Sequence, residues 1–583
     1  MKKIYLHIAL LLISLWQPAT AIEPGQRFVT VAFHDVVDSV ADIEDDTVTT
    51  DRLIAFFDFL KGDGWTVLTL DDVQAAKNKT KTLPAKSVLI TFDDGYESLY
   101  SRVFPLALAY NYPVVAALVG EWMDAPPSAM VPYGGKLVPR TKFLSWDAAR
   151  EMQRSGLVEF ASHTYSLHKD VLANPQGNRM PIAITQRFDE VTGTYESQSQ
   201  YEQFLIQNFK LDRAIFKREL KKLPRALVWP FGRYSEKSLD IAKRAGYQFA
   251  LTLDPEPSDA VDLLRIARYL PTRDPKLGEE IEYLRFQDRL PTVQRLACLD
   301  PAELISDSAQ EFDRRLGVFI ERTREMGVTN VVIPAAFVDQ NQTVQSWFPT
   351  SASGVKSDGL SRIVWQVQTR AGVSPTVSVP LQEMQRSGMS QSQIDQWFND
   401  LGRMVPVQSL LIRDLQQVDR QNVLDKKAPV EGPWQTRAIR NHLDLTALPA
   451  YEQQAFKGVK IINAFRPGVQ LYTLKHGEDN FTVSDAIDLT LFTTSIDKNA
   501  WNAAVNHIEQ AGLLSKESTR RRVGLWLTDL APPNPDQLSQ ASLYFQAKKG
   551  TAIGWCPDLW LQNHPNAAEV APAVSAARFP LRP

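Results

Sequence analysis

The chain is poor in cysteine: its 583 residues include only two, Cys298 and Cys556. Two cysteines cannot form the disulfide framework that stabilises small secreted domains, so large hydrophobic cores must hold this fold together. The sequence leaves two alternatives for the pair. The thiols could form one disulfide in an oxidising compartment, or both could be buried unpaired, because free cysteine behaves as a small apolar side chain.

An excess of positive charge is also missing. The chain has 64 Lys and Arg residues against 67 Asp and Glu residues, a formal net charge of −3. A dedicated nucleic-acid binder would show a basic excess or patch, so no nucleic-acid partner is expected. The hydrophobic fraction of 44% and the charged fraction of 22% are ordinary for globular proteins. They exclude a disordered chain, a collagen-like repeat and a membrane-embedded bundle.

The apolar run at the N-terminus is too short to span a bilayer. It extends over 13 residues, from Ile4 to Trp16, whereas a membrane anchor needs roughly 20. Two lysines precede it and Ala-Thr-Ala follows at 19–21, the layout of a secretory signal peptide cleaved after Ala21. No cysteine lies near this point, which excludes a lipoprotein anchor. We expect residues 1–21 to be removed and the mature chain to be periplasmic, with an association with the outer membrane left open.

Short apolar runs alternate with amphipathic segments through the first half of the chain. The runs with strand character are Phe28–Phe33, Trp65–Leu70, Ser87–Phe92, Val114–Val119, Val158–Ala161, Ala226–Trp229 and Gln248–Leu253. The segments with a helical period are Asp51–Leu60, Ser98–Tyr110, Trp146–Arg154, Tyr201–Lys222 and Glu236–Arg244. This alternation predicts right-handed βαβ units and a parallel sheet long enough to close into a barrel. Residues 173–200 show no clear period, and we expect a long excursion there, a common location for loops that contact substrate.

The alternation breaks around residues 286–300 and then resumes. Helices are predicted at Gln310–Met326, Gly359–Arg370 and Ser392–Leu401, and strands at Val328–Ile333, Val373–Val379, Leu410–Ile412, Val459–Ala464, Arg522–Leu527 and Thr551–Trp555. A second barrel-like α/β domain is therefore expected at 289–583, after a first domain at 22–288, with a margin of about ten residues on the boundary.

Histidine is scarce, with 8 residues in the whole chain, and its placement in the first domain is informative. Beyond the signal segment that domain has three histidines, His34, His163 and His168, and all lie at or just after predicted strand ends. Asp93-Asp94-Gly95 and Trp229-Pro230-Phe231-Gly232 occupy two further strand ends. Barrel enzymes build their active sites at this edge of the sheet. Asp-Asp-Gly alone is more often a simple turn, so the prediction of an active site depends on the histidines and both of these runs occurring together at strand ends.

One carboxylate and two imidazoles form an open site for a divalent metal, with positions left for water and substrate. A neighbouring aspartate can then take a proton from the attacking water. The residues by themselves therefore predict metal-assisted hydrolysis of an amide or an ester.

Three of these runs resemble signature motifs of the polysaccharide deacetylases of carbohydrate esterase family four. They are Thr91–Gly95, Ser162–Thr164 with His168, and Trp229–Gly232. Nearly the whole mature length resembles the branch of that family with a second, glycoside-hydrolase-like domain. The resemblance implies an α/β protein of two barrel-like domains. The first would be a (β/α)7-type deacetylase barrel and the second a (β/α)8-type barrel.

The resemblance also implies roles for single residues. Asp94, His163 and His168 would hold one divalent metal ion, and Asp93 would be the general base. Zinc, nickel, cobalt and iron all suit such a site, so the sequence does not choose among them.

The reaction also requires a general acid. Many family members use a histidine late in the domain, but this chain has none between His168 and His442. His34 is then expected to protonate the leaving amine; the alternative is a histidine that only packs in the core. Backbone N–H groups around Phe231 and Gly232 are candidates for stabilising the developing oxyanion.

In relatives the second domain binds partly deacetylated polymer and in some cases cleaves it. Glycosidases usually need paired carboxylates. Where relatives carry His-Asp-Asp, this chain has Arg413-Asp414-Leu415, so a binding platform is favoured over a cleaving enzyme. The expected glycan contacts are Asp414, Trp555, Asp558 and Trp560.

The combined expectation is an exported, metal-dependent N-deacetylase that acts on a poly-β-1,6-N-acetylglucosamine polymer of the biofilm matrix and releases acetate. The partners implied by the resemblance are this polymer and an outer-membrane export porin, and a monomer is expected. Two alternatives remain open: a non-catalytic glycan-binding or export scaffold, and an enzyme with hydrolase activity in both domains.

Overall fold

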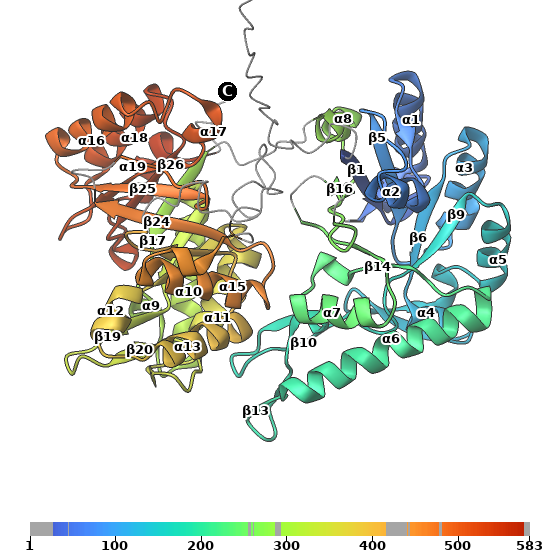
Figure 1. Ribbon diagram of the computed structural model, residues 1–583, viewed down its shortest axis with the longest axis horizontal. Helices are drawn as coiled ribbons and strands as arrows, with labels where there is room; N and C mark the ends of the chain where they lie inside the picture. Colours follow the sequence, from blue (N-terminus) through green and yellow to red (C-terminus); the bar gives the residue numbers. More distant parts are fainter. Residues whose placement is uncertain are drawn as a thin grey trace, which may run out of the picture.

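The computed structural model describes residues 27–44, 46–254, 258–260, 262–285, 293–415, 440, 443–476 and 481–576. The predicted signal segment at 1–21 and the predicted boundary at 288/289 lie outside the described residues. Within the described part, no helix combines the length and apolar character needed to cross a membrane. Figure 1 shows two α/β bodies, one built on an open sheet and one on a closed barrel.

The first body contains the predicted parallel sheet. Its seven parallel strands are β1 (Arg27–Phe33), β4 (Thr66–Val67), β5 (Ser87–Phe92), β6 (Val114–Leu118), β9 (Val158–Ser162), β14 (Ala226–Val228) and β15 (Phe249–Leu251). Their order is β15-β14-β9-β6-β5-β1, and β4 pairs with β5. The predicted strand at 65–70 is shorter than expected, because a capping box between Thr69 and Asp72 starts helix α2 (Leu70–Lys77) at its end.

Both faces of this sheet are covered, which explains why its strands are apolar runs rather than alternating ones. On β5, Val88, Ile90 and Phe92 pack against the outer helices, whereas Leu89 points to α2 on the other face. The outer helices of this cluster are α1 (Thr50–Gly62), α3 (Phe104–Tyr110), α5 (Trp146–Arg154) and α6 (Gln198–Leu220). Helix α7 (Glu236–Arg244) packs with the amino-terminal half of α6 in a separate cluster.

The sheet does not close by strand pairing between β15 and β1. The chain that follows β15 spans this seam instead: β16 (Ser258–Asp259) pairs antiparallel with β1, Ile266 bridges Leu251 of β15, and Tyr269 bridges Val31 of β1. This segment carries Arg268 across the seam.

The predicted excursion at 173–200, together with the residues just before it, forms two small hairpins; this segment, 170–200, is called the excursion below. They are β10 (Asp170–Leu172) with β11 (Arg179–Pro181), and β12 (Phe188–Asp189) with β13 (Thr194–Tyr195). Strands of two or three residues are too short to produce a readable period, which is why the sequence shows none.

The second body is the predicted (β/α)8-type barrel. Its closed sheet consists of β17 (Gln294–Cys298), β18 (Asn330–Pro334), β22 (Ser374–Val379), β23 (Ser409–Ile412), β24 (Gln470–His476), β25 (Leu489–Thr494), β26 (Val523–Thr528) and β27 (Ala552–Cys556). The main surrounding helices are α10 (Ala309–Met326), α11 (Leu360–Gln366), α12 (Leu381–Arg386), α13 (Gln391–Met404), α15 (Ala450–Asn463), α16 (Lys498–Gln510), α18 (Pro535–Ala547) and α19 (Ala567–Val574).

One predicted strand of this domain is wrong. Residues 459–464 belong mostly to helix α15, in which Val459 and Ile462 are buried three positions apart on one face. A short β-branched run fits either a strand or a buried helix face, so periodicity could not separate them. Strands β17, β24 and β25 were not predicted.

The two cysteines form a disulfide between Cys298 and Cys556. They follow Ala297 and Trp555, which are paired across β17 and β27, the first and last strands of the barrel. The covalent bond therefore joins the strands whose pairing closes the barrel.

We predict that this bond stabilises the barrel mainly by restricting the unfolded chain. Replacing both cysteines by alanine should lower the free energy of unfolding by about 2–4 kcal/mol, measured by denaturant titration. Reductant should destabilise the parent protein to a similar extent and leave the double variant unchanged. Equal stability of the oxidised parent and the double variant would contradict the prediction.

Candidate active site

The three predicted metal ligands lie together at the carboxyl edge of the first sheet. Asp94 follows β5, His163 follows β9, and His168 lies five positions further along the same loop. The Nε2 atoms of His163 and His168 lie 3.3 and 3.2 Å from Oδ1 of Asp94. Asp94 is 1% exposed and has a left-handed backbone, with φ 68°.

This arrangement fits a divalent cation. Metal–ligand bonds of about 2.1 Å at tetrahedral or octahedral angles place neighbouring ligand atoms about 3.0–3.4 Å apart, as observed here. Nδ1 of His163 lies 2.8 Å from the carbonyl oxygen of Val228, a contact that assigns its proton to Nδ1 and leaves the Nε2 lone pair facing Asp94. Burial opposes ionisation of Asp94, but the two imidazoles lower the pKa of its carboxyl well below the usual range.

Asp93, the predicted base, is held by an arginine that the sequence analysis missed. Nη1 of Arg268 donates to Oδ1 of Asp93 at 2.8 Å and to Oγ1 of Thr91 at 3.0 Å. Burial raises the pKa of Asp93, but the charges of Arg268, His163 and His34 outweigh this effect and lower it overall. Asp93 is therefore ionised and can accept a proton. Arg268 belongs to no motif; its only signal is a charge within the apolar run 266–270.

His34 lies at the end of β1 on the other side of Asp93. Its Nε2 atom is 3.9 Å from Oδ2 of Asp93, and its side chain is 13% exposed. Among the described residues, Nδ1 of His34 has no hydrogen-bond partner. A group that is mostly buried, open at one side and beside the base is placed to transfer a proton to substrate.

Two further polar residues at this edge were not predicted. The Tyr133 hydroxyl donates to Oδ2 of Asp46 at 2.8 Å and also lies 3.4 Å from Oδ2 of Asp94. Asp46 also lies within 4.8 Å of ligand atoms of His34 and Asp94. Tyr133 ends β7 (Met130–Tyr133), which forms a hairpin with β8 (Lys136–Pro139). No spacing in the sequence connects this hairpin to the motifs.

Aromatic rings surround His168. Its ring centroid lies 4.9 Å from that of Trp122 in α4 (Gly120–Asp124) and 4.6 Å from that of Phe231. Phe231 is 46% exposed, so part of its ring is open to solvent beside the predicted metal ligands. The expectation for Gly232 is corrected: its N–H donates to the Trp229 carbonyl at 2.9 Å and cannot also bind an oxyanion.

A buried carboxyl lies behind the histidine motif. Oδ2 of Asp212, in α6, accepts a hydrogen bond from the Tyr247 hydroxyl at 2.8 Å, and that hydroxyl also lies 3.3 Å from Oγ of Ser162. Ser162 in turn accepts from the Thr164 N–H at 2.9 Å, within the turn that carries His163. Burial raises the pKa of Asp212 to about 7.

In the second domain, Asp414 lies at the carboxyl end of β23. Its Oδ1 is 3.2 Å from Nδ1 of His476 at the end of β24, and its Oδ2 accepts from Nε2 of Gln382 at 3.3 Å. A histidine from the neighbouring strand therefore lies beside Asp414, although the Arg413-Asp414-Leu415 run itself contains none.

The other three residues expected to contact glycan are part of the core. Trp555 is 0% exposed, and Trp560 is buried with its ring edge-on to Phe319. Asp558 is also buried and accepts from Nη2 of Arg322 at 2.7 Å. Side chains without an accessible face cannot stack on a sugar, so this expectation is wrong for Trp555 and Trp560, and Asp558 is a structural ion pair.

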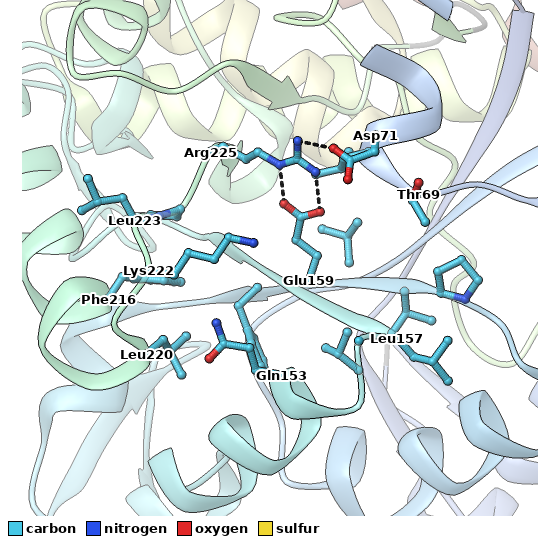
Figure 2. A pocket seen from close by; sticks show the side chains of 18 of the residues that line it. Thr69, Asp71, Gln153, Leu157, Glu159, Phe216, Leu220, Lys222, Leu223 and Arg225 are labelled. Carbon is cyan, nitrogen blue, oxygen red and sulfur yellow. Dashed lines mark hydrogen bonds and ion pairs between the residues drawn. The ribbon is translucent and has the colours of Figure 1, made fainter. Parts of the chain in front are cut away.

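A cavity of about 220 Å³ opens at the opposite, amino-terminal ends of β6, β9 and β14. Figure 2 shows its polar wall, where Arg225 donates twice to Glu159, at 2.6 and 2.9 Å, and once to Asp71, at 2.6 Å. The single positive charge of Arg225 is thus shared between two carboxylates. None of the predicted site residues lines this cavity.

Comparisons with known proteins show which proteins the chain resembles. Residues 80–250 match the family model described as polysaccharide deacetylase. The chain is 33% identical over 362 residues to the poly-beta-1,6-N-acetyl-D-glucosamine N-deacetylase of Escherichia coli. That alignment covers 61% of this chain and 53% of the relative, so the chain spans about half the length of that relative.

Two solved structures are also similar. A de-N-acetylase from Aggregatibacter actinomycetemcomitans is 35% identical, with a TM-score of 0.42, and covers 44% of this chain and 99% of its own. A glycoside hydrolase domain from Bordetella bronchiseptica is 15% identical, with a TM-score of 0.38, and covers 48% of this chain and 99% of its own.

The raised pKa of Asp212 predicts a pH-dependent stability. The folded state binds a proton here that the unfolded chain releases near pH 4, so the free energy of unfolding should fall as pH rises from about 4 to 7. A shift of this size corresponds to a fall of about 4 kcal/mol. Asp212→Asn should remove it and be the more stable protein at pH 8. Denaturant unfolding in the presence of chelator, at pH 5 and pH 8, measures this.

Asp240→Asn is the matched control, because this carboxylate is exposed on α7 and pairs only with Arg244 there. It should keep the pH dependence of the parent. An Asp212→Asn protein with the same slope as the parent would show that Asp212 is ionised in the folded state.

Proposed function

We propose that this chain is an exported, metal-dependent N-deacetylase that removes acetyl groups from poly-β-1,6-N-acetylglucosamine. The observation that carries the proposal is the buried set Asp94, His163 and His168 beside an ionised Asp93 and a partly open His34. The activity for which the E. coli relative is named supports the substrate.

One divalent ion of zinc, nickel, cobalt or iron, held by Asp94, His163 and His168, would polarise the acetamide carbonyl and make water a better nucleophile. Asp93, fixed by Arg268, accepts a proton as the water oxygen bonds to the carbonyl carbon. His34 donates a proton to the nitrogen as the C–N bond breaks, which releases acetate and leaves an amine on the sugar. The open part of the Phe231 ring provides an apolar surface for the sugar ring, and the backbone N–H of Phe231 remains a candidate for the oxyanion.

The predicted signal segment supports export, and the expected compartment is the periplasm. There the enzyme would act on polymer on its way out of the cell, with an outer-membrane porin as the next component. Free amines give the polymer positive charge, which would alter its transport and its retention in a biofilm matrix. The chain would therefore act in the assembly of that matrix. It would act as a monomer and without a nucleic-acid partner.

For the second domain we propose glycan binding at the carboxyl end of the barrel. Asp414 is the observation that favours it: a carboxylate beside His476 and Gln382 can accept hydrogen bonds from sugar hydroxyls and from the ammonium groups of the deacetylated product. Leu415 replaces the second carboxylate that cleavage would require, so binding is favoured over hydrolysis.

Acetate release from N-acetylglucosamine oligomers tests the catalytic proposal. Asp93→Asn and His34→Ala should each lower kcat about 10²–10⁴-fold, because each removes a proton-transfer group. Both should retain bound metal, whereas Asp94→Asn should lose metal and activity together. Asp147→Asn, at an exposed carboxylate on α5, is the matched control and should behave as the parent.

The scaffold alternative makes the opposite prediction. A parent protein that releases no acetate after treatment with chelator and resupply of each candidate metal would overturn the enzyme proposal. Activity that survives chelation would overturn its metal dependence alone.

Binding of partly deacetylated oligomers, measured by calorimetry in an Asp93→Asn background, tests the second domain. Asp414→Asn should weaken binding about 5–50-fold, since it removes a charged acceptor. Asp529→Asn, at the end of β26 on another part of the same rim, should bind as the parent does. Unchanged affinity in Asp414→Asn would remove Asp414 from the site. Shortening of oligomers by the parent, lost in Asp414→Asn, would show cleavage in place of binding.

A further inference from the structure

The metal ligand His168 begins a segment that ends against the second domain. Strand β10 starts two positions after His168 and pairs with β11. The Ile182 N–H then donates to the carbonyl oxygen of Lys169 at 3.1 Å, so the hairpin is bonded to the residue directly after the ligand. Any displacement of this hairpin is transmitted to His168 through one peptide unit.

An arginine of the second domain holds the turn of this hairpin. Nη1 of Arg362, in α11, donates to the carbonyl oxygen of Gln176 and lies 3.5 Å from Oδ1 of Asn178. Nε and Nη2 of the same guanidinium donate to Oδ1 of Asp313 in α10, at 2.9 and 2.6 Å. The ion pair to α10 therefore fixes the guanidinium while it binds the turn, and Asn178 is buried in this contact.

Two more contacts hold the rest of the excursion. The Tyr195 hydroxyl donates to Oδ2 of Asp358, just before α11, at 3.3 Å. Nε of Arg403, at the end of α13, donates to Oε1 of Gln186 at 2.9 Å. Figure 1 shows the hairpins of the excursion reaching toward α11 and α13.

The domains are also joined away from the excursion. The N–H of Glu236, at the start of α7, donates to the carbonyl oxygen of Ala464, at the end of α15, at 2.9 Å. The positive end of one helix dipole thus meets the negative end of the other. This contact does not involve the hairpins, so weakening the hold on the excursion leaves a second attachment in place.

The three ligands differ in how they are supported. Asp94 and His163 lie one or two positions after strands of the sheet, whereas His168 lies further along the loop and its side chain is 14% exposed. We propose that the second domain positions His168, with Arg362 as the main positioning residue and Asp358 and Arg403 as supports. The inference rests on the proposed metal site. Because coupling between two equilibria is reciprocal, metal binding and docking of the excursion stabilise each other.

Zinc affinity of the full mature protein tests the inference. In Arg362→Ala, zinc should bind about 5–20-fold more weakly and leave faster to a competing chelator, as when an outer support of a ligand is lost. The visible spectrum of the cobalt-substituted protein should change, since it reports the ligand field of His168. At saturating metal, kcat should recover most of its parent value. Arg362→Lys, which retains a donor for the Gln176 carbonyl, should restore part of the affinity.

Arg314→Ala is the matched control. Arg314 is an exposed arginine of α10 that pairs with Glu311, and among the described residues it makes no hydrogen bond or ion pair with the first domain. It should bind zinc as the parent does. Arg403→Gln provides a second test if Arg362→Ala folds poorly, and thermal unfolding checks all variants.

The outcomes separate the two proposals. If the parent binds no zinc and releases no acetate, the metal site itself fails. If the parent does both and Arg362→Ala and Arg403→Gln match it in zinc release and in the cobalt spectrum, only the positioning role fails. Hydrogen exchange gives an independent check: zinc should slow exchange at 170–196 and in α11 of the parent, but not in α11 of Arg362→Ala.

Discussion

The burial of one carboxylate, that of Asp94, is the main constraint on this structure. Asp94 is almost fully buried, and an anion in such a place is costly unless opposite charge reaches it. Two imidazoles face its Oδ1, and a cation between the three groups meets the requirement. The backbone adapts to it: Asp94 and Gly95 both have positive φ, and a side chain at Gly95 would meet Leu118 at 2.6 Å. The strand end, the turn and the loop are all arranged around this one charge.

The open seam of the first sheet allows a charged side chain to reach Asp93. A fully paired barrel would have filled the gap between β15 and β1 with another strand, whose backbone would satisfy its neighbours but supply little charge. The crossing segment instead brings Arg268 inward, where it bonds the Thr252 carbonyl, Thr91 and Asp93. Arginine stays protonated over the physiological pH range, so its charge favours the ionised form of Asp93 throughout that range.

The sequence predicts the features of the fold and of the site that depend on local residue patterns. Apolar runs and strand ends located both sheets and the residues His34, Asp93, Asp94, His163 and His168, since parallel strands bring their carboxyl ends to one edge. Arg268, Asp46 and Tyr133 join that edge through contacts between distant segments, which leave no periodic trace. The burial of Trp555 and Trp560 was missed for a related reason: residue type does not reveal which face of an element is covered. The disulfide followed from barrel closure, which a sequence does not display.

The pairing of β17 with β27 also sets an order of assembly. Every strand of the first sheet is complete by residue 259, whereas the barrel cannot close until residues 552–556 have been made. When the chain folds from its N-terminus, the first domain can therefore collapse early, with Asp94 and His163 fixed near their strand ends, while the excursion after His168 still lacks its docking surface. The proposed metal centre would thus reach its final rigidity only once the last strand is in place.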